Sequence, residues 1–149
     1  MKITVIGSRG QLGQDLTARL AGEGHQVSGL THQQISIENA SSIADALAQT
    51  APELVINTAA YNKVDLAESE PEVAYAVNAL GPRNLALYCQ QHQIALMQIS
   101  SDYVFGLDLS REQGYREQDA PGPVSAYGLS KLAGEYFVRA LCPQHYVIR

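Results

Sequence analysis

A glycine-rich turn near the start of the chain constrains the fold more than any other feature of the sequence. A β-branched run from Lys2 to Ile6 leads into the turn GSRGQLG, and leucines then recur at four-residue spacing as Leu12, Leu16 and Leu20. These patterns predict a strand, a tight loop and an amphipathic helix in direct succession. Such a succession is typical of the first unit of a parallel α/β sheet.

The rest of the chain continues the alternation of strands and helices. Further strands are expected at His25 to Leu30, Leu54 to Asn57, Ala95 to Ser100 and Tyr146 to Arg149. Helices are expected to follow a cap at Asn39 or Ser41, to begin at Pro71 with a kink or restart at Gly81-Pro82, and to run from Ala126 to Leu141. Short connections between such elements imply right-handed crossovers. The sequence therefore predicts an α/β fold, a doubly wound parallel sheet of the Rossmann-like, three-layer αβα kind.

A long segment from Ser101 to Val124 interrupts this regular pattern. It exceeds an ordinary connection, so we expect a functional loop there. Tyr103 and Phe105 are expected in the core. Asn78 is interpreted as satisfying backbone groups at the helix break, and Glu68 as a negative charge near a helix N-terminus.

Gly7, Gly10 and Gly13 give the first turn the pattern G-x-x-G-x-x-G. Without side chains at these positions, backbone amides can approach a pyrophosphate at the N-terminus of the following helix. Three glycines alone are a weak signal, and a tight turn with close helix packing is the alternative. The position at the first strand-to-helix turn favours dinucleotide binding.

The choice of dinucleotide depends on the residues around the second strand. An NAD site usually has a carboxylate after that strand, whereas this chain has Leu30, Thr31 and His32 there. Arg9 could instead pair with a ribose 2′-phosphate, because a guanidinium presents several donors in a fixed fork. NADPH is therefore favoured and NADH remains possible. The alternative for Arg9 is a solvated loop charge.

Tyr127 and Lys131 are four residues apart at the start of a predicted helix, so their side chains share one face. A phenol has a pKa near 10, and a neighbouring positive charge lowers it; a shift to about 7 corresponds to roughly 4 kcal/mol. Ser101, at the carboxyl end of the fourth strand, could offer its hydroxyl to a substrate carbonyl oxygen. The set suits carbonyl reduction, although an isolated Y-x-x-x-K usually marks a solvated helix face.

Composition excludes several other classes of protein. The formal net charge of the 149 residues is −5 and no basic run is present, which argues against a nucleic-acid or anionic-membrane surface. No transmembrane or signal segment is recognisable, so a soluble cytoplasmic protein is expected. Cys89 and Cys142 are interpreted as small buried hydrophobes. No metal site is predicted, because the histidines lack ligand spacing: His25, His32, His92 and His145.

A series of motifs resembles the extended short-chain dehydrogenase/reductase family along the whole chain. Besides GSRGQLG, the series comprises NTAAYNKVDLAESEP from Asn57, AVNALGPRNLA from Ala76, ISSDYVFG from Ile99 and YREQDAPGPVSAYGLSKLAGE from Tyr115. Within the family, the chain is most similar to reductases that act on the 4-keto group of a nucleotide-linked deoxysugar. An ordered series at family spacing is more specific than any single motif.

The resemblance implies roles for individual residues. Tyr127 would donate a proton to the sugar C4 oxygen, Lys131 would hold the nicotinamide ribose and tune Tyr127, and Ser101 and Asp102 would contact the substrate. Ser36 stands where relatives often have an aspartate near the adenine. The residues expected at the cofactor are Gly7, Arg9, Gly10, Gln11, Leu12, Gly13, Ser36, Ile37, Ala59, Ala60, Tyr61, Asn62 and Lys131.

The resemblance also implies an organisation and partners. Members of the family are about twice this length, and their C-terminal half supplies most of the nucleotide-sugar pocket. Residues 1–149 are therefore expected to form the NAD(P)-binding domain, without the substrate-binding part. The partners expected are a nucleotide sugar and, for the full-length protein, a second copy in a homodimer.

Two alternative functions remain open at this point. An epimerase or dehydratase of the same superfamily would use the same tyrosine and lysine with a tightly held NAD. A non-catalytic NADP-binding regulatory subunit would need neither. The presence of Ser101, Tyr127 and Lys131 together favours catalysis.

Overall fold

A five-stranded parallel sheet organises the computed structural model, which describes residues 1–149. The strand order is β2-β1-β3-β4-β5, and every neighbouring pair is parallel. This arrangement confirms the predicted α/β fold. The strands are β1 (Lys2–Ile6), β2 (Gln26–Leu30), β3 (Leu54–Asn57), β4 (Ala95–Ile99) and β5 (His145–Ile148).

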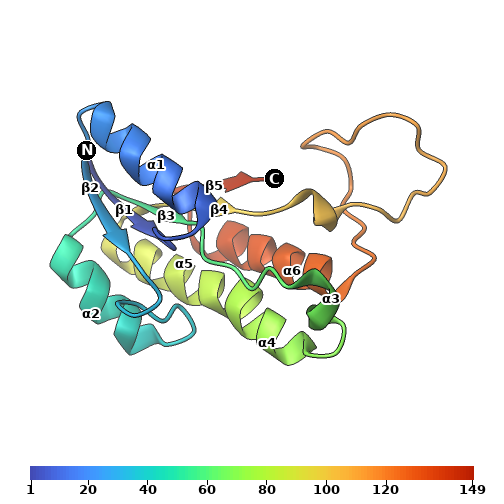
Figure 1. The fold of residues 1–149 in the computed structure, drawn as a ribbon, viewed down its shortest axis with the longest axis horizontal. Helices are drawn as coiled ribbons and strands as arrows, with labels where there is room; N and C mark the ends of the chain where they lie inside the picture. Colours follow the sequence, from blue (N-terminus) through green and yellow to red (C-terminus); the bar gives the residue numbers. More distant parts are fainter.

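Helices cover the sheet on both faces (Figure 1). Helix α1 (Gln11–Gly22) lies on one face, and α2 (Ala40–Thr50), α5 (Gly81–His92) and α6 (Ala126–Leu141) lie on the other. Two short helices, α3 (Val64–Ala67) and α4 (Pro71–Tyr75), contact α6. The three-layer αβα arrangement is therefore confirmed. None of these helices has both the length and the apolar character needed to cross a membrane.

The core is thicker on the face that carries three long helices. Fully buried side chains such as Leu47, Leu85 and Leu96 belong to this main apolar cluster. Cys89 and Cys142 are also in it, as free thiols, which confirms the prediction that they are buried hydrophobes. A smaller cluster centred on three buried residues lies between the sheet and α1. Most of the buried apolar side chains thus lie between the sheet and helices α2, α5 and α6.

The Gly81-Pro82 pair does not break the helix. Instead a π-helical turn, Ala76–Leu80, joins α4 to α5, and Gly81 keeps helical dihedral angles (φ −56°, ψ −57°). Pro82 has no N–H to donate to the carbonyl of Asn78, and a π turn accommodates this missing bond without ending the helix. The carbonyl of Asn78 packs against Gly134 of α6, where a Cβ would overlap it. Of the predicted kink or restart, the restart is confirmed, because α5 begins at Gly81 with Pro82 in its first turn.

The long loop after β4 has its own order. It starts with a 3₁₀ turn at Asp102–Val104, and an isolated antiparallel bridge pairs Gly106 with Pro123. The prediction that Tyr103 lies in the core is wrong: it is 48% exposed and meets Tyr127 edge-on, with ring centroids 5.5 Å apart. Within this 3₁₀ turn the neighbouring Val104 is the buried residue, and the Tyr103 side chain stays at the surface. Phe105 is half-buried, stacked on the Tyr115 ring.

Candidate active site

The glycine turn brings the start of α1 against the tips of β1 and β3. Gly7 has φ +83°, and a Cβ there would lie 2.7 Å from Thr58 Oγ1 and 2.9 Å from the Ala59 nitrogen. Only glycine combines this backbone conformation with this approach. Gly13, in the first turn of α1, packs directly on the Gly7 carbonyl, which a Cβ would overlap. The turn therefore packs tightly, as the alternative interpretation of the glycines required.

The same turn leaves the N-terminus of α1 open. Gly10 is the N-cap, with extended dihedral angles, and no side chain caps the first turn of this 12-residue helix. First-turn amides have no intrahelical acceptor, and the helix dipole adds partial positive charge at this end. This end of α1 can therefore accept an anion such as a pyrophosphate. Tight packing and anion binding are compatible uses of one turn.

A groove of about 450 Å³ opens beside this turn at the carboxyl ends of β1 and β3. The chain leaves β1 toward β2 on one side and returns to β3 on the other, so the strand order reverses here. Ligands of open α/β sheets bind at such a reversal. Eight of the predicted cofactor residues line the groove: Gly7, Arg9, Gly10, Ile37, Ala59, Ala60, Tyr61 and Asn62.

The other predicted cofactor residues lie elsewhere. Gln11 and Leu12 are exposed on the first turn of α1, and Gly13 is buried beneath the turn. The Ser36 hydroxyl donates to the carboxylate of Glu38 at 3.0 Å. Lys131 is buried on α6 beneath the end of β4.

Sequence reasoning missed several residues of the groove. Thr31, His32 and Thr58 line it, and their position directly after β2 and β3 was the signal that could have found them. Glu38 also lines the groove. The argument that no carboxylate is available after the second strand was therefore too narrow, because the chain beyond β2 folds back and brings Glu38 to the same site.

Two caps fix where α6 begins and so where Tyr127 lies. The Ser125 hydroxyl accepts the Gly128 N–H at 3.0 Å, and the Glu68 carboxylate accepts the Ala126 N–H at 2.8 Å. A side-chain oxygen at each of these amides replaces the missing helical acceptors. Tyr127 consequently occupies the first turn of α6. Glu68 thus caps α6 rather than a helix close to it in sequence.

Ser101 and Tyr127 are brought together at the carboxyl end of β4. The Ser101 hydroxyl accepts the Tyr103 N–H at 3.1 Å, which orients it at the start of the 3₁₀ turn. Burial raises the pKa of Tyr127, the nearby Ser101 hydroxyl opposes this, and the carboxylate of Asp102 raises the pKa further. Tyr127 therefore stays protonated at neutral pH, as a proton donor must.

Lys131 lies one turn beyond Tyr127 and is only 4% exposed. Its ammonium donates to the Ile99 carbonyl at 2.8 Å. Burial lowers the pKa of Lys131 to about 8, and the negative charge of Glu135 partly opposes this. The sequence led us to expect that Lys131 would lower the pKa of Tyr127. In the protein by itself the pKa of Tyr127 is raised, because burial outweighs the opposing effects.

Asn78 joins the loop that lines the groove to α6. Its Oδ1 accepts the Tyr61 N–H at 2.9 Å, and its Nδ2 donates to the Tyr61 carbonyl at 2.9 Å and to the Ser130 hydroxyl at 3.0 Å. Ser130 in turn donates to the Tyr127 carbonyl at 2.7 Å. Asn78 does satisfy backbone groups, as predicted, but those of the loop after β3 rather than of its own helix.

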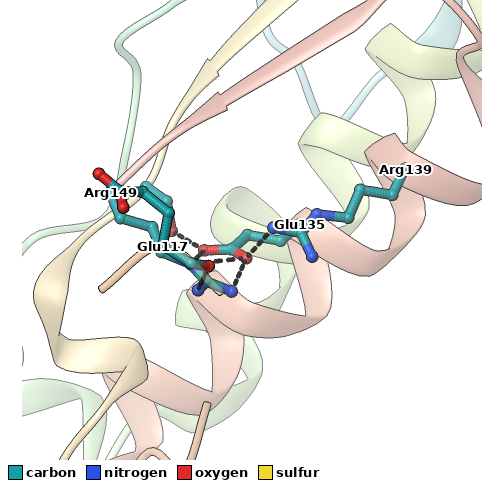
Figure 2. A network of polar contacts seen from close by, with 5 residues as sticks. Glu117, Glu135, Arg139 and Arg149 are labelled. Atoms are coloured by element: carbon teal, nitrogen blue, oxygen red, sulfur yellow. Dashed lines mark hydrogen bonds and ion pairs between the residues drawn. The ribbon is translucent and has the colours of Figure 1, made fainter. Parts of the chain in front are cut away.

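A fully buried carboxylate, Glu135, lies one turn beyond Lys131 on α6 (Figure 2). Arg149 approaches it with Nη2 at 2.8 Å and with Nε at 3.1 and 3.2 Å from the two oxygens. The Ser100 hydroxyl donates to it at 2.6 Å, and Arg139 lies at 3.5 Å. Sequence reasoning missed Glu135; an acidic residue four positions after Lys131, on the same helix face, was the available signal.

Comparison with known proteins finds one family description that matches residues 1–149, "RmlD substrate binding domain". A dTDP-4-dehydrorhamnose reductase of Mycolicibacterium smegmatis is 44% identical over 99% of this chain and 44% of its own length. A solved dTDP-4-dehydrorhamnose reductase of Clostridium acetobutylicum superposes with a TM-score of 0.92 at 39% identity, covering 99% of this chain and 52% of that one.

A third similar protein was solved with a ligand. The dTDP-4-dehydrorhamnose reductase of Bacillus anthracis, in complex with NADP, is 38% identical with a TM-score of 0.92, over 99% of this chain and 52% of that chain. The chain therefore spans about half the length of the curated relatives it matches.

Proposed function

The chain belongs to the RmlD substrate binding domain family, and from this membership we propose that it binds NADPH between β1 and β3 and supplies the catalytic groups that reduce a 4-keto nucleotide sugar, dTDP-4-dehydrorhamnose or a close analogue. The observation that carries the proposal is the Asn78 bridge, which ties the loop of the groove to the helix of Tyr127. The names of the relatives support this reaction, and the NADP complex of a relative supports this cofactor.

The residues of the groove fit a phosphorylated dinucleotide. The uncapped start of α1 and the glycine turn offer amides to its pyrophosphate. Arg9 lines the groove near Thr31 and His32, and its guanidinium forms no hydrogen bond or ion pair within the protein. It is therefore free to pair with a 2′-phosphate. Glu38 could accept hydrogen bonds from ribose hydroxyls, which keeps NADH as a second, weaker cofactor.

The reaction adds a hydride to the carbonyl carbon and a proton to its oxygen. NADPH, when bound, supplies the hydride. Tyr127, kept protonated by burial, donates the proton, and Ser101 donates a hydrogen bond to the same oxygen. Asp102 is exposed beside them and would contact the sugar. Lys131 would hold the nicotinamide ribose, and its positive charge would favour the phenolate that Tyr127 becomes after proton transfer.

The proposal extends to the whole protein. We assign residues 1–149 to the NAD(P)-binding domain and most of the nucleotide-sugar pocket to the part that corresponds to the other half of the relatives. A cytoplasmic location, expected from the composition, and a homodimer of the full-length protein, implied by the family resemblance, remain predictions.

The test is turnover of dTDP-4-dehydrorhamnose by this chain fused after Arg149 to the C-terminal half of the M. smegmatis relative. NADPH absorbance should fall with time, and Tyr127→Phe should abolish the loss while leaving NADPH binding intact. The matched control is Tyr136→Phe, an exposed tyrosine on the same helix. A fusion that folds and binds NADPH but turns over equally with Tyr127→Phe would refute the role of Tyr127.

A further inference from the structure

The charges around Lys131 form a chain that runs from α6 to the end of β5. Lys131 does not form an ion pair with Glu135. Instead, each of the two side chains hydrogen-bonds to one of two consecutive residues at the end of β4. The Ile99 carbonyl accepts from Lys131, and the Ser100 hydroxyl donates to Glu135. Arg149 then holds both oxygens of Glu135 (Figure 2). One fully buried carboxylate thus lies between a buried ammonium and a guanidinium.

We propose that Glu135 is a positioning residue that keeps the buried Lys131 ammonium protonated at the working site, and that Arg149 limits how strongly it does so. The inference rests on the proposed function, because it assigns Glu135 a role in keeping charged the lysine that would hold the cofactor. A buried cation without a nearby anion loses its proton, because the interior solvates charge poorly. Burial lowers the pKa of Lys131 and the carboxylate of Glu135 opposes that fall.

The other charged or titratable groups near Lys131 do not replace Glu135. Tyr127 on the same helix stays neutral, and Asp102 and Tyr103 of the 3₁₀ turn act on Tyr127. Arg139 and Arg149 are cations on the far side of Glu135. Asn78, from the π-helical turn packed on α6, carries no charge. Glu135 is therefore the carboxylate placed to act on this lysine.

The chain contains only three lysines, Lys2, Lys63 and Lys131, so each side chain can be followed separately by NMR after labelling lysine with carbon-13. Lys2 and Lys63 are exposed and serve as internal references. In Glu135→Gln, which keeps the shape and the acceptor for Ser100, the titration midpoint of Lys131 should fall by about one pH unit or more. Glu117→Gln makes the same change at an exposed site and should leave the midpoint unchanged.

The change in the Lys131 midpoint distinguishes an electrostatic role of Glu135 from a role in packing alone. If Glu135 served only to fill space, glutamine would fill the same space and the Lys131 midpoint would not move. A midpoint that rises or does not move in Glu135→Gln therefore overturns the proposal.

A second pair of variants decides the matter if Glu135→Gln does not fold. Arg149→Gln removes the cation that offsets Glu135, so the Lys131 midpoint should rise, whereas Arg149→Lys retains the charge and should leave the midpoint near its wild-type value. Equal midpoints in these two variants overturn the proposal. Different midpoints in the stated order support it.

NADPH binding supplies the link to the proposed function. If the charged form of Lys131 holds the cofactor, Glu135→Gln should match the wild type near pH 6 and bind about fivefold more weakly near pH 8, where its lysine is mostly neutral. A wild-type chain that binds no NADPH but shows the Lys131 shifts refutes the proposed function and leaves the role of Glu135 intact. If the chain binds NADPH but the Lys131 midpoint does not shift in Glu135→Gln, only the role of Glu135 is refuted and the proposed function stands.

Discussion

Asn78 hydrogen-bonds both backbone groups of Tyr61, accepting from the N–H and donating to the carbonyl, each at 2.9 Å. The first residue lies in a π-helical turn and the second lies in the loop after β3. An amide side chain carries both a donor and an acceptor, so Asn78 can satisfy the N–H and the carbonyl of one residue at once. The loop that lines the groove is therefore positioned by the helix that packs on α6.

Asn78→Ala should loosen this loop. The substitution removes three hydrogen bonds in a buried place, so the free energy of unfolding should fall by about 2 to 3 kcal/mol. Urea denaturation measures the change. Gln90→Ala, at an exposed position of α5, should change the free energy of unfolding by less than about 0.5 kcal/mol. Equal effects at the two positions would show that the Asn78 bridge is not needed.

Two glycines of α1 should respond to alanine in opposite directions. At Gly13 a Cβ would overlap the Gly7 carbonyl, so Gly13→Ala should lower the free energy of unfolding by about 2 kcal/mol or more. At Gly22 the space is open, and Gly22→Ala should raise it by about 0.5 kcal/mol, because the unfolded chain loses freedom. The same denaturation experiment compares them. A Gly13→Ala protein as stable as the wild type would contradict the tight packing of the turn.

Arg9 should distinguish the two cofactors. Arg9→Ala should weaken NADPH about tenfold and NADH little, because only NADPH carries the 2′-phosphate that a guanidinium can hold. Calorimetric titration with each cofactor measures the ratio. Arg19→Ala, at the other end of α1 where Arg19 pairs with Glu23, is the matched control and should affect neither. Equal losses of affinity for NADPH and NADH in Arg9→Ala would mean that Arg9 is a solvated loop charge and does not bind the 2′-phosphate.

The depressed pKa of Lys131 should appear in the pH dependence of stability. Its pKa is about 8 when folded against 10.5 for an ordinary lysine, so the unfolded state binds more protons between these values. The charged lysine therefore costs about 3 kcal/mol of folding free energy at neutral pH, and the cost disappears as the pH rises from 8 toward 10.5.

Lys131→Met provides the comparison. The difference in unfolding free energy, wild type minus Lys131→Met, should rise across this pH range and level off above it. Urea denaturation of both proteins at a series of pH values measures it. A difference that stays constant with pH would mean that Lys131 is not perturbed.

The sequence was sufficient to predict the strands, because short runs of apolar residues and the glycine turn are local signals. It was not sufficient to predict the π-helical turn, since Gly81-Pro82 reads as a break unless the packing of Asn78 on Gly134 is known. Tyr103 is likewise an aromatic residue in an apolar segment, but whether it is buried depends on tertiary packing, and in the structure it is exposed. Local sequence patterns specify the helices and strands, whereas tertiary packing determines the conformation and burial of the residues at their ends.

The candidate site divides in the same way. Gly7, Ser101 and Tyr127 follow from their place at strand and helix ends, where the fold itself predicts ligands. Glu38 and Glu135 could not be assigned so easily, because each reaches its place through chain reversal or burial far from a motif. Asn78 was visible but was given a local role, since its partner Tyr61 is close only in the folded chain.

The most direct test is a calorimetric titration of the 149-residue chain with NADPH, for the wild type and for Gly10→Asp. Aspartate suits the extended N-cap that Gly10 occupies, but its Cβ would lie 3.2 Å from the Gly7 carbonyl, so folding of the variant is verified by urea denaturation before the titration. Its charge would repel a pyrophosphate at the start of α1. We predict saturable one-to-one binding, tighter for NADPH than for NADH, and a loss of at least about tenfold in Gly10→Asp. A folded wild-type chain that binds no NADPH, or a Gly10→Asp chain that binds it equally well, would contradict the assignment of this groove.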